Sequence, residues 1–408
     1  MLKVYSPFDN KLIQEIPFHT LEEIENSIQK AFELHQQYPL GLPKFERVKV
    51  LENLVGLFKN EFDHIVDLAI SEGGKPLIDS KIEVNRAIEG IKLAIQGIYH
   101  IHGDEIPMGL SVASQNRWAF TTHEPIGVVL AISAFNHPVN LLIHQAITAI
   151  AAGCPVVLKP SLKTPLSALK LQELLQIAGL PQNWLTVVIC ENTITEKLVG
   201  DKRFSFVNFI GSAKVGWSLR KKLHPGTRCA LEHGGMASVL IHPSATLHKW
   251  LNPLVKGAFY HAGQVCVSVQ KVWVHHSKIN EIYHQLLPEI ESLKILAHHQ
   301  ITYDIVGVKE AHLKAAITIA EKIPSLNLVL DHLNNPPIPH QSQMDIWRTN
   351  IKLAAAHKNI YAKISGLALA TGKFETWTSA DIQASIEYAL EQFGTDRCFC
   401  GGDWPVSL

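Results

Sequence analysis

The sequence predicts an α/β protein built on parallel sheets, and three observations support this fold class. Continuous apolar strands in residues 128–210 alternate with helical segments, the pattern of a parallel sheet that helices cover on both faces. A glycine-containing turn, residues 211–216, follows one of these strands and precedes a helix. A second strand–helix alternation occupies residues 301–402. With 408 residues, the chain has room for two or three domains.

The first hundred residues predict a hairpin and then a layer of helices. Polar and apolar residues alternate around Asp9 and Asn10, which indicates a β-hairpin in residues 1–20. In residues 21–102 the apolar side chains recur with a helical period, and the Ser-Glu-Gly-Gly-Lys-Pro segment 71–76 interrupts it. Three stripes carry the period: Leu21, Ile24, Ile28, Ala31 and Leu34; Val48, Leu51, Leu54, Val55 and Phe58; and Ile82, Ala87, Ile91, Leu93 and Ile95.

The middle of the chain predicts the strands and helices of the first parallel sheet. Strands are expected at 128–132, 155–158, 185–189 and 206–210, and helices at 138–152 and 165–178. The second of these helices ends before Gly179, a residue type that favours helix ends.

Charge and composition exclude several classes of partner. Lys and Arg number 37, as do Asp and Glu, so that the net charge is zero and no basic stripe is present. We therefore expect neither nucleic acid nor an anionic membrane as a partner. The 22 histidines are scattered, and the pairs 275–276 and 298–299 lack the spacing of metal ligands, so no metal site is predicted.

Cysteine usage and hydropathy predict a soluble, cytoplasmic protein. The six cysteines show no Cys-x-x-Cys spacing, which favours reduced thiols over a disulfide framework. The first five residues contain no apolar signal core. The longest apolar run, residues 126–135, is too short to span a bilayer.

Two segments carry the residue types of covalent catalysis. Cys266 follows Gly263-Gln264-Val265, and a cysteine thiolate is the strongest nucleophile among side chains at neutral pH. Glu232 stands shortly before a Gly234-Gly235 break, and a carboxylate can activate the water that releases a thioester. The alternative interpretation of a cysteine in apolar surroundings is a small core residue.

The turn Gly211-Ser212-Ala213-Lys214-Val215-Gly216 favours a phosphate site. Free backbone N–H groups and the helix dipole attract an anion where a helix begins after a strand. The alternative is that small residues only let the helix pack closely. Lys159 directly follows another predicted strand and supports the cofactor interpretation; a GxGxxG dinucleotide motif is absent.

Residues 1 to about 288 resemble the aldehyde dehydrogenase superfamily. Six motifs occur in that family's order: Glu124-Pro125-Ile126-Gly127-Val128, Phe135-Asn136-His137-Pro138, Val157-Leu158-Lys159-Pro160-Ser161, Gly211-Ser212 with Val215-Gly216, Glu232-His233-Gly234-Gly235 and Gly263-Gln264-Val265-Cys266. The resemblance implies a parallel-sheet cofactor domain behind a helical layer, and a reaction in which NAD or NADP oxidises a small aldehyde to a carboxylic acid.

The resemblance also implies a role for each residue. Cys266 would attack the aldehyde, the Asn136 amide with the Cys266 N–H would hold the oxyanion, and Glu232 would activate water. Lys159 would bind the adenosine ribose, and the pyrophosphate would lie at Gly211, Ser212 and Gly216. The glutamate that many NAD-preferring relatives carry after this lysine is replaced by Leu162 and Lys163, which leaves NAD and NADP both open. The family's subunit-pairing strand is not found, which leaves a homo-oligomer open.

Residues 289–408 resemble the last part of the amidohydrolase-related sugar-lactone hydrolases, which are TIM barrels. The matching segments are 328–333, 361–367 and 393–405, with strands expected at about 301–306, 327–332, 360–365 and 397–402 and helices at 313–323, 346–357 and 382–393. The resemblance implies a partial (βα) barrel with His332 and Asp403 at the carboxyl ends of its strands, where such enzymes place their active sites. The His-x-His pair of that family's first strand is absent.

The chain is therefore interpreted as the first part of one enzyme joined near Pro288 to the last part of another. The predicted function is NAD(P)-dependent aldehyde oxidation. Two alternatives stay open: a sugar-lactone hydrolase that uses His332 and Asp403 as a remnant site, and a non-catalytic fusion that retains dinucleotide binding.

Overall fold

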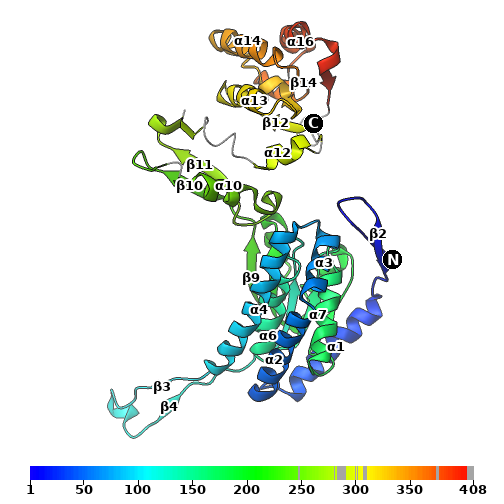
Figure 1. Ribbon diagram of the computed structural model, residues 1–408. Coiled ribbons are helices and arrows are strands. Elements are labelled where there is room, and N and C mark those ends of the chain that lie inside the picture. The colour runs from blue at the N-terminus through cyan, green and yellow to red at the C-terminus, as the bar shows by residue number, and fades with distance from the viewer. Residues whose placement is uncertain are drawn as a thin grey trace. The chain divides into compact units, whose positions relative to one another are not determined.

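A computed structural model describes residues 1–246, 249–279, 281–282, 291–298, 300, 302–306, 310–373 and 376–401 (Figure 1). The chain divides into two compact units. Unit 1 consists of Met1–Gly235 and Gln264–Val267, and unit 2 consists of Met236–Gly263 and Ser268–Leu408. The segment that carries Cys266 therefore belongs to unit 1. The join predicted near Pro288 lies outside the described residues.

Unit 1 is built on a five-stranded sheet in which every neighbouring pair is parallel. Its order is β7-β6-β5-β8-β9, with β5 at Val128–Ile132, β6 at Val156–Lys159, β7 at Leu185–Val187, β8 at Phe204–Gly211 and β9 at Arg228–His233. The four predicted strands are confirmed to within two residues at each end. The fifth strand, β9, was not predicted, because it combines charged and apolar residues at the edge of the sheet.

Alternate residues of the strands pack into two separate cores, which explains the continuous apolar runs. Val129 and Ala131 of β5 face the core formed by α2, α3, α4 and α7, whereas Val128 and Leu130 face the core that contains Ile24 of α1. Helices α2 and α4 also pack against each other (Figure 1). The helices of unit 1 are α1 (Leu21–Gln37), α2 (Lys44–Asn60), α3 (Phe62–Gly73), α4 (Leu77–Tyr99), α5 (Asn140–Leu142), α6 (Thr148–Ala151), α7 (Leu166–Ile177), α8 (Asn192–Leu198) and α9 (Ala213–Arg220).

The helix predicted at 138–152 contains a π-helical turn, η2 (Ile143–Ile147), between α5 and α6. Gln145 lies in this turn and is fully buried. Its Nε2 donates to the carbonyl oxygens of Ile132 and Asn208, each at 3.1 Å. The turn therefore brings one amide against both β5 and β8, and joins the two strands near their carboxyl ends.

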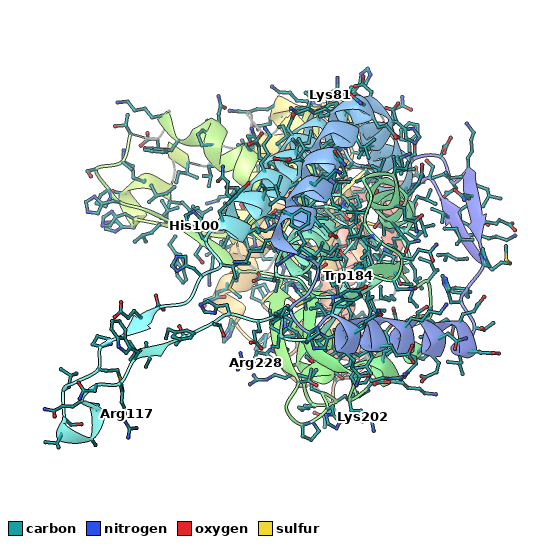
Figure 2. The ribbon with its side chains drawn as sticks, turned by 90° about the horizontal axis from the view of Figure 1, so that it is seen from below. Lys81, His100, Arg117, Trp184, Lys202 and Arg228 are labelled. Atoms are coloured by element: carbon teal, nitrogen blue, oxygen red, sulfur yellow. The ribbon has the colours of Figure 1, made fainter. Side chains whose placement is uncertain are left out.

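Two hairpins extend from unit 1. The predicted N-terminal hairpin is confirmed, with β1 (Leu2–Tyr5) antiparallel to β2 (Leu12–Ile16). A second pair, β3 (Glu105–Ile106) and β4 (Ala119–Phe120) with the 3₁₀ turn η1 (Val112–Ser114), forms an arm. Figure 2 shows Arg117 at the end of this arm, far from Trp184, which is buried in the unit's core.

Unit 2 contains two parallel sheets. Strands β10 (Ala237–Ile241) and β11 (Val269–Val274) form a pair, and β12 (Tyr303–Val306), β13 (Leu328–Asp331), β14 (Ile360–Ile364) and β15 (Cys398–Cys400) form a four-stranded sheet in chain order. Its helices are α10 (Leu251–Phe259), α12 (Glu291–His298), α13 (Glu310–Lys322), α14 (Gln341–Ala355), α15 (Leu367–Ala370) and α16 (Ser379–Phe393). The predicted strands and helices are confirmed. The partial barrel stays a prediction, because the described strands form a sheet and not a barrel.

None of the helices in the described ranges is both long and apolar enough to cross a membrane.

Glu72 makes the stability of unit 1 depend on pH. This side chain of α3 is 2% exposed and accepts hydrogen bonds from the backbone N–H groups of Leu166 and Ser167, at 2.7 and 2.9 Å, where α7 begins. Burial raises the pKa of its carboxyl from 4.5 to about 7, and these hydrogen bonds oppose the rise.

We predict that Glu72→Gln removes a pH-dependent part of the free energy of unfolding. A carboxyl whose folded pKa is raised contributes stability below pH 4.5 that is lost as the pH rises to about 7. The free energy of unfolding of the wild type should fall relative to the variant by about 3 kcal/mol over this range. Urea titrations at a series of pH values measure the difference. If the free energies of unfolding of the wild type and the variant differ by the same amount at every pH in this range, Glu72 stays ionised in the folded protein throughout it.

Candidate functional site

The carboxyl edge of the five-stranded sheet collects polar groups from three strands. Lys159 ends β6, Ser133 follows β5, and Gly211 ends β8. The Ser133 N–H donates to the Lys159 carbonyl oxygen at 3.0 Å, so that the ends of β5 and β6 stay in register. Ligands of open α/β sheets bind outside the carboxyl ends of the strands, which makes this edge the candidate cofactor site.

Lys159 is almost fully buried at this edge, with 4% of its surface exposed. Its Nζ donates to Asn192 Oδ1 at 2.9 Å, at the start of α8. Burial lowers the pKa of the ammonium, since the charged form loses hydration. A hydroxyl or phosphate oxygen placed beside the Lys159 ammonium would replace part of the hydration that the ammonium loses on burial.

The Gly211–Gly216 turn connects β8 to α9 as predicted. Ser212 caps the helix, and its Oγ accepts from the Val215 N–H at 3.4 Å. Gly216 lies against β9: a Cβ built there would come within 2.2 Å of His233 Nε2 and 3.1 Å of the Phe209 ring. The close packing of α9 on β9 therefore explains why residue 216 is a glycine. Gly211 and Ser212 lie where β8 ends and α9 begins.

Asn136 lies next to the Cys266 segment. It is half-buried in the turn after β5, and its Nδ2 donates to the Gln264 carbonyl oxygen at 2.7 Å. Its Oδ1 accepts from the His137 N–H at 3.1 Å, which orients the amide. Cys266 is exposed, whereas Val265 before it is 9% exposed and anchors the segment. The structure thus places the predicted site residue Asn136 against Gln264, in the segment that carries Cys266.

The Gly-Gly break after Glu232 lets two backbones approach closely. The Gly234 N–H donates to the Gly211 carbonyl oxygen, and the Gly235 N–H donates to the Cys266 carbonyl oxygen, both at 3.2 Å. A Cβ at Gly235 would lie 2.4 Å from that Cys266 oxygen. These bonds link the end of β9 to the Gly211–Gly216 turn and to the Gln264–Val267 segment. Glu232 precedes them on β9 with an exposed side chain.

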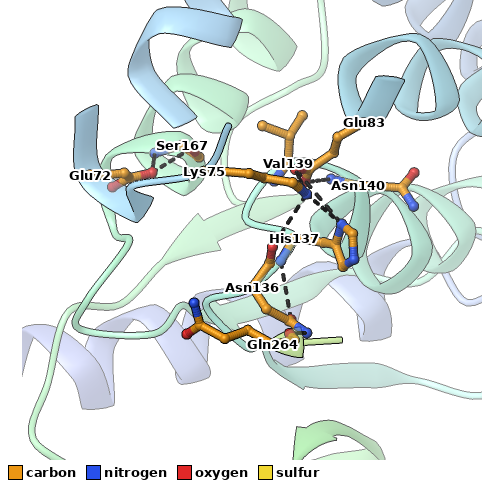
Figure 3. A network of polar contacts seen from close by, with 9 residues as sticks. All are labelled: Glu72, Lys75, Glu83, Asn136, His137, Val139, Asn140, Ser167 and Gln264. Carbon is orange, nitrogen blue, oxygen red and sulfur yellow. Dashed lines mark hydrogen bonds and ion pairs between the residues drawn. The ribbon is translucent and has the colours of Figure 1, made fainter. Parts of the chain in front are cut away.

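A buried polar network behind Asn136 was not predicted. Lys75, Glu83 and His137 contact one another beneath the turn that carries Asn136 (Figure 3). In the sequence, Lys75 is part of the Gly-Gly-Lys-Pro break, and Glu83 is one of many charged residues on a helix. Only the fold shows that both side chains are fully buried.

In unit 2, His332 follows β13, and its Nδ1 lies 2.9 Å from Ser365 Oγ. Asp331 ends the same strand and pairs with Lys363 Nζ at 2.9 Å. Asp403 lies outside the described residues. In the ranges that the structure describes, no group of three or more His, Cys, Asp or Glu side chains is placed to hold a metal ion.

Unit 1 is thus an α/β unit with an exposed thiol, Cys266, on a segment bonded to the end of β9. A model of the aldehyde dehydrogenase family matches residues 1–321, and the chain belongs to this family. It is 32% identical over 296 residues to a 3-sulfolactaldehyde dehydrogenase from Priestia aryabhattai, covering 72% of this chain and 61% of the relative. A lactaldehyde dehydrogenase from Methanocaldococcus jannaschii is 31% identical, with 72% and 63% covered.

A solved structure is similar over the same part of the chain. The NADP-dependent glyceraldehyde-3-phosphate dehydrogenase from Bacillus halodurans, complexed with NADP, has a TM-score of 0.68 and 28% identity, covering 71% of this chain and 61% of its own. The chain thus spans about three fifths of the length of these relatives. A model of the amidohydrolase family matches residues 268–408 and overlaps the first match at 268–321. The predicted resemblance to two families is confirmed.

The residues at the carboxyl edge fit a nicotinamide dinucleotide. Ser133 Oγ is buried there and has no hydrogen-bond partner among the described residues. A buried hydroxyl without a partner is destabilising, and a polar group of a bound ligand would satisfy it. Together with the Lys159 ammonium and the start of α9, this edge offers donors for both ribose and phosphate oxygens.

We predict that Gly216→Ala lowers the free energy of unfolding by about 1–3 kcal/mol, because the added methyl group would overlap the His233 ring and force this ring or α9 to shift. Gly97→Ala in α4 is the matched control, since no described atom lies within 4 Å of its added Cβ; it should gain about 0.5–1 kcal/mol. Urea unfolding measures both. Equal effects at the two positions would contradict the packing role of Gly216.

Proposed function

We propose that unit 1 uses NADP to oxidise a small aldehyde to a carboxylic acid through Cys266. The observation that carries this proposal is the 2.7 Å hydrogen bond from Asn136 Nδ2 to the Gln264 carbonyl oxygen, two residues before Cys266. It brings an amide donor beside a segment with an exposed thiol. Membership of the aldehyde dehydrogenase family supports the same chemistry.

The reaction begins at Cys266. Its thiolate attacks the carbonyl carbon, forms a C–S bond and leaves the former carbonyl oxygen with negative charge. When bound, the nicotinamide cofactor supplies the hydride acceptor that turns this adduct into a thioester. Water then breaks the C–S bond, which releases the acid and restores the thiol.

Asn136 acts on the oxyanion. A side-chain amide has two N–H hydrogens, and one of them is used by Gln264. The second hydrogen and the Cys266 N–H are the proposed donors to the developing charge. Losing one such donor typically lowers the rate by about 10²–10³.

Glu232 is the proposed base for the hydrolysis step. A carboxylate that takes a proton from water makes it a better nucleophile toward the thioester, a contribution of about 10²–10⁴ in rate. The exposed position of Glu232 on β9 gives it access to water, and the Gly234–Gly235 contacts tie the end of β9 to the Cys266 segment.

Lys159, Gly211, Ser212 and Gly216 are the proposed cofactor residues, with Lys159 on the adenosine ribose and the other three around the pyrophosphate. NADP is favoured because no carboxylate follows Lys159 to repel a 2′-phosphate, whereas Lys163 is close by and exposed. The similar structure from Bacillus halodurans contains NADP. The named relatives act on lactaldehyde and 3-sulfolactaldehyde, and these are the first substrates to test.

Lactone hydrolysis by unit 2 is the second candidate, favoured by the amidohydrolase match at 268–408. It would use His332 and Asp403. An unchanged rate of lactone opening in Asp403→Asn would exclude it.

We predict that NADP raises the thermal unfolding midpoint of the chain more than NAD does. Ligand at about 100 times its dissociation constant adds about 2.7 kcal/mol to the free energy of unfolding. Lys163→Gln should reduce the effect of NADP and leave that of NAD unchanged. A chain that unfolds cooperatively at the same temperature with and without either cofactor would contradict the proposed site.

We predict a burst of reduced cofactor from Glu232→Gln. If this carboxylate serves only thioester hydrolysis, one equivalent per chain should form rapidly before turnover slows by about 10²–10⁴. Cys266→Ala should show neither burst nor turnover. Cys400→Ala, which removes another exposed thiol, is the control with full activity. Slow turnover of Glu232→Gln without a burst would place this residue in an earlier step.

A further inference from the structure

Lys75 is a fully buried cation at the centre of unit 1. It stands between α3 and α4, where Gly74 adopts a left-handed conformation (φ +62°) and Pro76 precedes the first turn of α4. Its Nζ donates to Glu83 Oε2 at 2.6 Å and to the Asn136 carbonyl oxygen at 3.3 Å, and it lies 2.6 Å from His137 Nδ1. An ammonium carries three donor hydrogens, enough for the two oxygens and, in the tautomer whose Nδ1 carries no proton, for the His137 ring.

Glu83 fixes the other side of the same turn. Its Oε1 accepts from the backbone N–H groups of Val139 and Asn140, at 2.8 and 2.9 Å, where α5 begins. Burial opposes ionisation of Glu83, but the His137 and Lys75 side chains beside it and the Asn140 N–H prevail and lower the pKa of its carboxyl. One carboxylate therefore holds both the start of α5 and the Lys75 ammonium.

These bonds surround Asn136, whose side-chain amide contacts Gln264 in the segment that carries Cys266 (Figure 3). The Asn136 carbonyl oxygen and the ring of the next residue, His137, are both held by Lys75. The Asn136 side chain then points the other way, toward Gln264. The orientation of its amide thus depends on a turn that is held from beneath by two buried charges.

We propose that the Lys75–Glu83 ion pair is a positioning device that holds the Asn136 amide in place for the oxyanion. This role rests on the proposed function. Stability alone is a poor reason for the pair, because neutral residues of similar volume usually replace a buried ion pair without loss of stability. A displacement of about 1 Å at a reacting centre, in contrast, can lower a rate about 10²-fold.

The test uses the full chain with both charges removed, Lys75→Met/Glu83→Gln, because removal of one partner alone would leave a buried charge without its counterion. We expect cooperative unfolding near the wild-type midpoint and an unchanged dissociation constant for NADP. The value of kcat should fall about 10–100-fold. Glu72→Gln is the matched control, because the buried Glu72 side chain likewise accepts hydrogen bonds from the start of a helix, α7, and the variant should leave kcat unchanged.

A double-mutant cycle with Asn136 separates positioning from general loosening of the fold. In an Asn136→Ala background, the two substitutions should lower kcat by less than about 3-fold, because the group that they position is gone. If the double substitution lowers kcat by the same factor with and without Asn136→Ala, the proposal is overturned. It is also overturned if the double substitution leaves kcat unchanged in the otherwise wild-type chain. If the paired variant does not fold, Glu83→Asp keeps the charge but withdraws the carboxylate from α5, and the same comparison applies.

A readout independent of activity separates this proposal from the proposed function. If no aldehyde is oxidised by the wild type, the proposed function fails, and the side-chain NH₂ resonances of Asn136 decide the positioning role. They are assigned by their loss in Asn136→Asp in ¹⁵N-asparagine-labelled protein. A shift of these resonances in Lys75→Met/Glu83→Gln, and none in Glu72→Gln, supports positioning; unchanged resonances overturn it.

Discussion

The parallel register of β5 with its neighbours is the constraint on which the candidate site depends. Because β6, β5 and β8 all run in one direction, their carboxyl ends meet at one edge and bring together Lys159, Ser133 and Gly211. Burial on both faces leaves each strand no alternative register, since a slip by one residue would exchange the residues that face the two cores. The alignment of these strand ends is thus a consequence of core packing.

Close approach of backbones then brings the thiol segment to this edge. Gly234 bonds to Gly211 and Gly235 bonds to Cys266, and a side chain at Gly235 would collide with the Cys266 carbonyl oxygen. The Asn136 amide holds the same segment through Gln264. Two short hydrogen-bonded contacts therefore determine where Cys266 lies, although it is distant in the sequence from both of its supports.

The sequence predicts those parts of unit 1 that a local pattern specifies. Strands β5 to β8 alternate with helices and are mostly apolar, so both their type and their approximate bounds could be predicted. The π-helical turn at Gln145 could not, because it depends on acceptors in β5 and β8 that only the fold brings near. Lys75 and Glu83 were missed for a related reason: a charged residue in a sequence resembles any surface charge, and its burial is a tertiary property. The roles of Cys266, Asn136 and Glu232 came from resemblance and stay predictions.

The division of the chain into units determines which of the candidate site residues belong to unit 1. The backbone leaves unit 1 at Gly235 and returns to it for Gln264–Val267, so that Cys266, the Asn136 amide and the carboxyl edge of the five-stranded sheet belong to the same unit. The amidohydrolase match begins at residue 268, directly after this return. Cys266, the Asn136 amide and the Lys75–Glu83 pair therefore all precede the amidohydrolase match and lie in one compact body.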